Sequence, residues 1–153
     1  MQLSKDWREF IELLNSNEVD FLIVGGVAVA WHGHPRFTSD IDILVRPTSA
    51  NGECVIQALR QFGFAHLELT PDDINQPDQI IQLGYPPIQI DLLTSISGVD
   101  FDDAWAARVE GEMEGVRAKF IGFDDLIRNK ESTGRGKDLG DASVLRERRG
   151  KAT

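Results

Sequence analysis

Three aspartates lie in two short apolar segments, with a spacing that suits metal chemistry. Asp40 and Asp42 alternate with isoleucines in the segment 40–45, so both carboxylates of this expected strand project from the same face. Two ionised carboxylates held this close repel each other, and a divalent cation removes that cost. Oxygen ligands of this kind suit Mg²⁺, with Mn²⁺ as an alternative. Asp91, in the similar segment 88–93, would complete a three-carboxylate site if the two strands are neighbours.

A pair of glycines supplies the second half of the candidate site. Residues 21–24 form a short apolar run typical of a buried strand, and Gly25-Gly26 then turns the chain into an apolar segment, 27–31, that we expect to be helical. Glycines between a strand and a helix expose backbone N–H groups, which attract phosphate. Arg36 and Ser39, between this helix and the aspartates, are further candidate phosphate-binding residues.

Each of these features also has an ordinary structural interpretation. A glycine pair after a strand is usually a tight turn, and an isolated Asp-x-Asp is usually solvated or caps a helix. Their combination, in this order and with Asp91 in a matching strand, favours the site. His32 and His34 have no third ligand nearby, so we expect exposed capping or phosphate-contacting residues. For Tyr85 we expect a turn anchor, with contact to a nucleobase as the alternative.

The composition indicates a globular protein. Of the 153 residues, 41% are hydrophobic and 27% are charged, and the formal net charge of -9 argues against broad DNA binding. Residues 128–153 hold eight Lys and Arg residues against four Asp and Glu residues, so a basic end follows an acidic body. The single cysteine, Cys54, excludes an internal disulfide, and we expect it to be buried on a helix. The three tryptophans are expected to pack in the core or between helices.

Neither a signal peptide nor a membrane-spanning segment is visible, because no apolar run approaches the roughly 20 residues that a bilayer requires. We therefore expect a cytoplasmic protein without membrane partners. We also expect one domain over residues 1–153, with a C-terminal helical segment at about 123–150.

Hydrophobic periodicity predicts alternating helices and strands. The expected helices run from the N-cap Ser4 to Asn15–Asn17, and over 27–31, 52–62, 101–108, 124–130 and 137–149. The expected strands are 21–24, 40–45, 64–69, 79–83, 88–93 and 116–121, whereas the acidic segment 71–77 and the Gly-rich segment 132–136 are expected to be loops. Because residues 84–87 form a hairpin-type link between two strands, the pattern predicts an α/β or α+β fold with a mixed sheet covered by helices.

The spacing of these residues resembles the signature of the polymerase-β-like nucleotidyltransferase superfamily. The matching residues are Leu22-Ile23-Val24-Gly25-Gly26, then a spacer of thirteen residues, then Asp40-Ile41-Asp42-Ile43. Asp91 in its strand resembles the third carboxylate of that family. A later segment is similar to the C-terminal motif of small bacterial AbiEii-type members, some of which act as toxins; its residues are Asn129-Lys130, Thr133 to Leu139, and Asp141.

The resemblance implies transfer of a nucleoside monophosphate from a nucleoside triphosphate to an acceptor, with Mg²⁺ and release of pyrophosphate. It implies that Asp40 and Asp42 bind the metal, and that Asp91 binds metal and helps to activate the acceptor hydroxyl. Either Lys130 or Lys137 would contact the phosphates, and the alternative for Lys137 is an ion pair with its neighbour Asp138.

The acceptor is left open by the sequence, with RNA, protein and a small molecule as candidates. Because the chain is short, a nucleotide-binding module without catalysis is the alternative function. The resemblance also suggests a member of a toxin–antitoxin or phage-defence pair, with an antitoxin-like protein as its partner.

Overall fold

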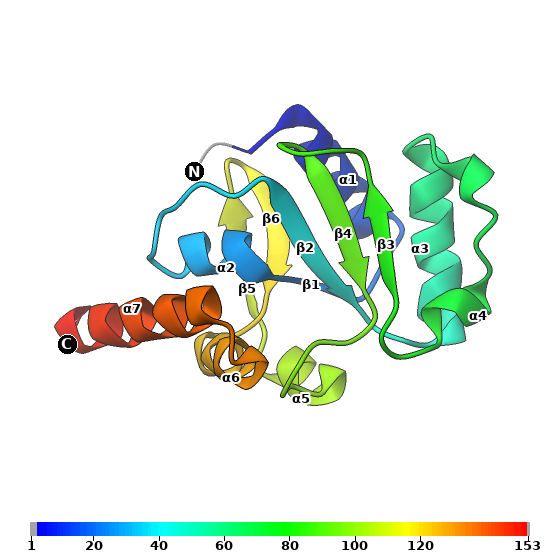
Figure 1. Cartoon of the computed structure of the whole chain (residues 1–153). Coiled ribbons are helices and arrows are strands. Elements are labelled where there is room, and N and C mark those ends of the chain that lie inside the picture. Colours follow the sequence, from blue (N-terminus) through cyan, green and yellow to red (C-terminus); the bar gives the residue numbers. More distant parts are fainter. Residues whose placement is uncertain (1–2, 153) are drawn as a thin grey trace.

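The computed structural model of the chain describes residues 3–152 and has a six-stranded sheet with the strand order β3-β4-β2-β1-β6-β5 (Figure 1). The strands are β1 (Phe21–Val24), β2 (Asp40–Val45), β3 (Ile80–Leu83), β4 (Gln89–Leu93), β5 (Val109–Met113) and β6 (Val116–Phe120). Strand β2 pairs parallel with β4 and antiparallel with β1, so the sheet is mixed, as predicted.

The expected helices are present in the expected order; most of them are longer than predicted, whereas the helix expected over 101–108 ends two residues early, at Ala106. They are α1 (Lys5–Ser16), α2 (Gly25–Trp31), α3 (Ser49–Gln61), α4 (Pro71–Ile74), α5 (Phe101–Ala106), α6 (Phe123–Thr133) and α7 (Gly136–Ala152). Caps explain two of these boundaries. Ser4 accepts a hydrogen bond from the backbone N–H of Trp7 at 3.1 Å, and Thr48 accepts one from Asn51 at 3.2 Å, so α3 begins three residues before the expected start. None of the described helices has the length and apolar character needed to cross a bilayer.

The core lies between the sheet and the helices that cover it. The helix α1 buries Trp7, Phe10, Ile11 and Leu14, which lie on one face at helical spacing. In Figure 1, α1 passes behind β4, whereas α2 and the C-terminal pair α6 and α7 lie on the near side. All four residues of β1 are buried, which explains why this strand is a continuous apolar run.

Two segments differ from the sequence prediction. The expected strand 64–69 is instead a single 3₁₀ turn, Ala65–Leu67, because Glu68 adopts a left-handed backbone (φ 52°) that a strand does not allow. The expected loop 71–77 contains the short helix α4. The Asp73 carboxylate accepts hydrogen bonds from the backbone N–H and the hydroxyl of Thr70, at 2.8 and 3.1 Å, and so caps this helix.

One strand was absent from the sequence prediction. In β5 only Val109 and Met113 are large apolar residues, so its sequence does not resemble a buried strand. It is an edge strand that pairs antiparallel with β6, and Gly111 leaves room there for the ring of Trp31.

The loop between α6 and α7 is also shorter than expected. Helix α6 ends at Thr133, and Gly134, whose φ of 71° is left-handed, forms its C-cap.

Candidate functional site

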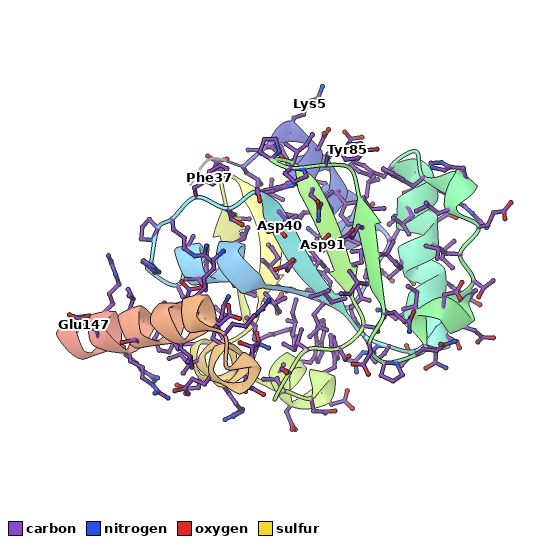
Figure 2. The ribbon with its side chains drawn as sticks, viewed as in Figure 1. Lys5, Phe37, Asp40, Tyr85, Asp91 and Glu147 are labelled. Carbon is purple, nitrogen blue, oxygen red and sulfur yellow. The ribbon has the colours of Figure 1, made fainter. Side chains whose placement is uncertain are left out.

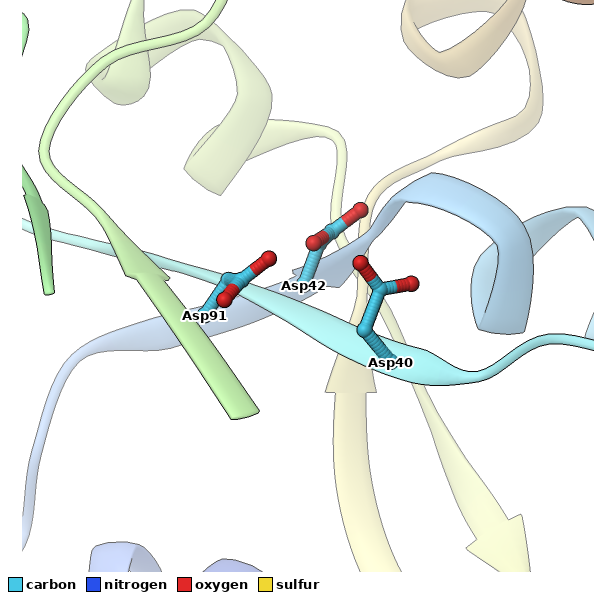
Figure 3. A group of neighbouring side chains, drawn as sticks. All are labelled: Asp40, Asp42 and Asp91. Carbon is cyan, nitrogen blue, oxygen red and sulfur yellow. The ribbon is translucent and has the colours of Figure 1, made fainter. Parts of the chain in front are cut away.

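The three aspartates singled out by the sequence lie together on two adjacent strands. Asp42 is the register partner of Asp91 across the parallel pair β2–β4, and Asp40 lies two residues earlier on β2. One carboxylate oxygen from each residue lies within 4.8 Å of the other two (Figure 3). Asp91 is 8% exposed, whereas Asp40 and Asp42 are half-buried. The three aspartates therefore form one acidic cluster.

The alternation of each strand determines where these carboxylates point. Ile41 and Ile43, the neighbours of Asp42, are fully buried on the opposite face of β2. Ile90 and Leu92, the neighbours of Asp91, are likewise buried on the opposite face of β4. A shift of either strand by one residue would bury a carboxylate and expose an isoleucine, so the apolar residues fix the register of the acidic face.

Two polar side chains support the aspartates, and the sequence analysis did not single them out. The Gln89 amide donates a hydrogen bond to Oδ1 of Asp91 at 2.8 Å. The Thr38 hydroxyl donates to the backbone carbonyl of Asp40 at 2.8 Å and lies 3.4 Å from its Oδ1 atom. Gln89 precedes Asp91 by two positions within β4, a spacing that places both side chains on the same face and is a usable signal.

The carboxylates have unusual acidity because they are buried next to one another. Burial, followed by the charges of Asp40 and Asp91, raises the pKa of Asp42 to about 7, and the charge of Lys130 opposes this rise. Burial also raises the pKa of Asp91; the charge of Asp40 adds to the rise, and the Gln89 hydrogen bond opposes it. The group is thus poor in compensating positive charge. Three such oxygen donors fit a hard divalent cation of the Mg²⁺ type.

The first glycine of the pair packs directly against this acidic group. Gly25 has a φ of 66°, and a Cβ atom on it would overlap the Asp42 carboxylate. A Cβ atom on Gly26 would lie 3.0 Å from the Arg36 guanidinium and 3.1 Å from the Thr38 hydroxyl. Helix α2 therefore begins in contact with the carboxylates, two residues earlier than the expected segment 27–31.

Basic residues from two distant parts of the chain meet beside the carboxylates. Lys130, 6% exposed on α6, lies 3.0 Å from a carboxylate oxygen of Asp138 and 3.4 Å from one of Asp141. Arg36 contacts the same Asp141 carboxylate at 3.1 Å. Asp141 therefore joins the loop before β2 to α6 and α7. Asp141 belongs to the C-terminal motif described above, but the sequence predicted no role for it.

Lys137 and Ser39 are not part of the network around Asp138 and Asp141. The Asp138 carboxylate accepts hydrogen bonds from Lys130, Thr133 and Arg135, so the alternative prediction of an ion pair between Lys137 and Asp138 is wrong. The Lys137 side chain is exposed. Ser39 is half-buried directly before Asp40.

The histidines and the lone tyrosine do not join the carboxylates. His32 and His34 are half-buried rather than exposed. The His32 ring lies 2.7 Å from the carbonyl oxygen of Ile121, and burial lowers the pKa of His32. His34 lies 3.8 Å from Asp141. Tyr85 is 83% exposed, so its side chain does not anchor the turn as expected.

The remaining sequence predictions concern packing. Trp7 is buried, and Trp31 stacks on Phe120 with ring centroids 4.0 Å apart, which agrees with the expected structural roles. Trp105 is half-buried and stacks on Phe101. Cys54 lies on α3 as expected but is only partly buried.

Comparison with known proteins shows the family of this chain. Residues 3–148 match the model of the family described as "Nucleotidyl transferase of unknown function (DUF2204)", and the chain belongs to this family. The predicted membership of the nucleotidyltransferases is thereby confirmed. No curated protein sequence matches the chain.

Solved structures with low sequence identity share the fold. One is a protein assigned as a nucleotidyltransferase from Thermotoga maritima, with a TM-score of 0.57 and 14% identity over 94% of this chain and 90% of that chain. Another is an antigenic nucleotidyltransferase-like protein from Paracoccidioides brasiliensis, with a TM-score of 0.55 and 15% identity over 94% of this chain and 77% of that chain.

Proposed function

We propose that the chain is a metal-dependent nucleotidyltransferase, which moves a nucleoside monophosphate from a nucleoside triphosphate to an acceptor hydroxyl. The observation that carries this proposal is the convergence of Asp40, Asp42 and Asp91, whose oxygens lie within 4.8 Å of one another against the start of α2. Carboxylates arranged in this way suit phosphoryl chemistry, in which positioning and charge neutralisation provide most of the catalysis.

Metal binding is the first role that we assign to the three aspartates. Mg²⁺, or Mn²⁺ in its place, would be held by the carboxylates of Asp40, Asp42 and Asp91, and it would neutralise charge on the phosphates. The raised pKa values of Asp42 and Asp91 support this role, because they show that the site favours added positive charge.

The transfer itself breaks one bond and forms one. The acceptor oxygen forms a bond to the α-phosphorus, the bond between that phosphorus and the bridging oxygen breaks, and pyrophosphate leaves. The Asp91 carboxylate receives the proton of the acceptor hydroxyl. Backbone N–H groups at Gly25-Gly26 and the charges of Arg36 and Lys130 stabilise the leaving pyrophosphate.

Radiolabelled ATP, CTP, GTP and UTP, incubated with the protein, Mg²⁺ and separate fractions of cellular RNA, protein and small molecules, test this proposal. Label should move to one fraction with the wild type and not with Asp42→Asn, which keeps the side-chain shape but removes a charge. Asp103→Asn, a change of an exposed aspartate on α5, is the matched control and should transfer normally. Equal labelling by the wild type and Asp42→Asn would contradict the proposal.

Calorimetry with a non-hydrolysable triphosphate and Mg²⁺ separates catalysis from binding. Binding without transfer to any fraction would favour a nucleotide-binding module instead.

The AbiEii-type relationship and an antitoxin-like partner remain predictions from the resemblance. Growth arrest on expression of the wild type, absent with Asp42→Asn, would support an enzymatic toxin.

A further inference from the structure

Strand β3 lies at the end of the sheet, where it pairs with β4 and has no partner strand on its other edge among the described residues (Figure 1). Its sequence, Ile-Ile-Gln-Leu, contains none of the charged residues or prolines that usually protect an edge strand from pairing. Ile80 is 63% exposed, and Gln82 is exposed as well. An unprotected edge of this kind suits an extended protein segment that adds to the sheet as a further strand.

The backbone groups on this free edge belong to Ile80 and Gln82. The backbone N–H of Thr94 donates to the carbonyl oxygen of Gln79 at 3.1 Å, which makes these two residues a hydrogen-bonded pair. Hydrogen-bonded and non-hydrogen-bonded pairs alternate along an antiparallel ladder, so Ile81 bonds β4 and the backbone groups of Ile80 and Gln82 point away from it. An added strand would therefore form its hydrogen bonds with Ile80 and Gln82.

Gln82 also belongs to a row of residues that crosses the sheet through the carboxylate site. Gln82 is the register partner of Asp91 on β4, and Asp91 is the register partner of Asp42 on β2. Figure 2 shows Asp91 between Asp40 and strand β3. The start of α2 lies at the other end of this row, because Gly25 packs against Asp42. Phosphates bound there leave the β3 end for the acceptor, since the attacking and leaving oxygens lie roughly in line on opposite sides of the phosphorus.

A cavity, which we call the Phe62 cavity, lies near the same end of β3 on the opposite face of the sheet. It measures about 250 Å³, and its apolar lining includes Leu83 and the stacked rings of Phe62 and Phe64. Leu83 follows Gln82, and successive side chains of a strand point to opposite faces. In an added strand, the residue opposite Gln82 would lie on the face of the carboxylates, and its neighbour beside Leu83 would point to the Phe62 cavity.

The charges around this edge favour a basic partner. Asp6 and Glu9 on α1 are the two charged residues in the lining of the Phe62 cavity. The chain has no Lys or Arg between Arg60 and Arg108, a segment that includes β3 and β4 and holds eight Asp and Glu residues. A lysine of the added strand would pack its aliphatic part against the phenylalanine rings and place its ammonium group near Asp6 and Glu9. The same charges disfavour nucleic acid at this edge.

Strand spacing determines which hydroxyl group reaches the carboxylates. Neighbouring strands lie about 4.8 Å apart, so an added strand lies roughly 10 Å from β4 and Asp91. The hydroxyl groups of serine and threonine are attached to Cβ and do not span this distance, whereas a tyrosine hydroxyl lies at the far end of a ring. Gln82, whose carboxamide forms no hydrogen bond within the described part of the chain, would lie beneath that ring.

On the basis of the proposed function, we propose that the free edge of β3 binds an extended, lysine-bearing segment of a partner protein, and that a tyrosine of this segment is the acceptor. The tyrosine lies opposite Gln82 with its hydroxyl at Asp91, and an adjacent lysine enters the Phe62 cavity. In the transfer, the tyrosine oxygen forms a bond to the α-phosphorus and the bond from that phosphorus to the bridging oxygen breaks. Pyrophosphate leaves, and Asp91 receives the phenol proton.

Binding of the peptide acetyl-Thr-Val-Lys-Tyr-Lys-Val-Thr-amide to the nucleotide-free protein tests the docking surface by fluorescence anisotropy. Lysines on both sides of the tyrosine allow either strand direction. Glu9→Gln should weaken binding about twofold to fivefold, the loss expected for one exposed ion pair. The matched control is Glu53→Gln, a change of an exposed glutamate on α3 outside the cavity lining, which should bind as the wild type does.

A second peptide isolates the contribution of the strand edge. N-methyl groups on its Lys-Tyr-Lys amides keep every side chain and charge but remove the backbone donors. This peptide should bind about tenfold more weakly, because it loses hydrogen bonds to the edge of β3.

Transfer of label from radiolabelled nucleoside triphosphates with Mg²⁺ tests the acceptor. The tyrosine peptide should become labelled. Versions with phenylalanine or serine in place of tyrosine should stay unlabelled, because the first has no hydroxyl and the second does not reach Asp91.

The outcomes separate this proposal from the proposed function. No peptide binding, or equal binding of the N-methylated peptide, would overturn the docking surface even if transfer to RNA or to a small molecule were demonstrated. Equal affinities of Glu9→Gln and Glu53→Gln would overturn the place of the lysine. Labelling of another fraction, but not of the bound tyrosine peptide, would overturn the acceptor. Peptide binding with the expected losses, but without transfer to any acceptor, supports the docking surface and contradicts only the proposed function.

Discussion

Gly25 contacts the carboxylate of Asp42 so closely that any Cβ atom at position 25 would overlap it. The two residues lie 17 positions apart in the sequence, and the β1–β2 pairing brings them together, with Val24 as the register partner of Asp42. A single relationship thus joins the turn that begins α2 to the acidic group on β2.

Gly25→Ala should disrupt the site by displacing Asp42, in addition to the strain of a left-handed alanine. That strain alone costs about 1–2 kcal/mol. Gly115→Ala is the matched control, because Gly115 also has a positive φ (82°) but has open space around its Cβ position. We expect both variants to lose stability in urea unfolding, and only Gly25→Ala to lose Mg²⁺ binding by calorimetry. Equal Mg²⁺ affinity in both variants would show that the contact with Asp42 is unimportant.

The stability of the metal-free protein should carry a signature of the Asp42 carboxyl. The folded pKa of about 7 lies above the ordinary value of 3.8. The protonated folded state is therefore favoured, and the stability that this group contributes is present below pH 4 and is lost as the pH rises to 7.

Asp42→Asn removes this dependence. In EDTA, the melting temperature of the variant minus that of the wild type should increase by several degrees from about pH 4 to about pH 8. Mg²⁺ should raise the melting temperature of the wild type at pH 8 and reduce this difference. A difference that does not change with pH would contradict the raised pKa of Asp42.

Lys130 should be important for stability, because two buried carboxylates depend on it. Lys130→Met leaves Asp138 and Asp141 with less compensating charge, and removing one member of a buried ion pair costs about 3–5 kcal/mol. Lys137→Met is the matched control on an exposed neighbour and should change the free energy of unfolding by less than about 0.5 kcal/mol. Urea unfolding of the two variants provides the comparison, and similar losses would contradict the buried network.

Gln89→Leu should shift the pH dependence of metal binding. The Gln89 amide stabilises the ionised form of Asp91, so its loss raises the pKa of Asp91 further. Metal competes with protons for carboxylates, and the rise of Mg²⁺ affinity with pH should therefore move to higher pH in the variant. Calorimetric titrations between pH 5 and pH 8 would check this shift. Gln57→Leu, an exposed change on α3, is the control that should leave the profile unchanged.

Local sequence patterns were sufficient for most of the fold. The continuous apolar run of β1 and the alternation in β2 and β4 identify strands by their burial. Local sequence patterns did not predict the structure correctly where tertiary contacts override local preference. Strand β5 exists because it pairs with β6, and its own sequence, with Glu110, Gly111 and Glu112 at its centre, has little strand character.

Part of the candidate site is likewise predictable from the sequence, and part depends on the tertiary structure. Asp40 and Asp42 face the same side because of the two-residue period of a strand, which is recognisable in the sequence. The position of Asp91 opposite Asp42 and the ion pairs of Lys130 with Asp138 and Asp141 depend on strand order and helix docking. Sequence periodicity carries the direction of a side chain within its own element. Only the tertiary structure decides which elements become neighbours, because that choice depends on contacts between residues far apart in the chain.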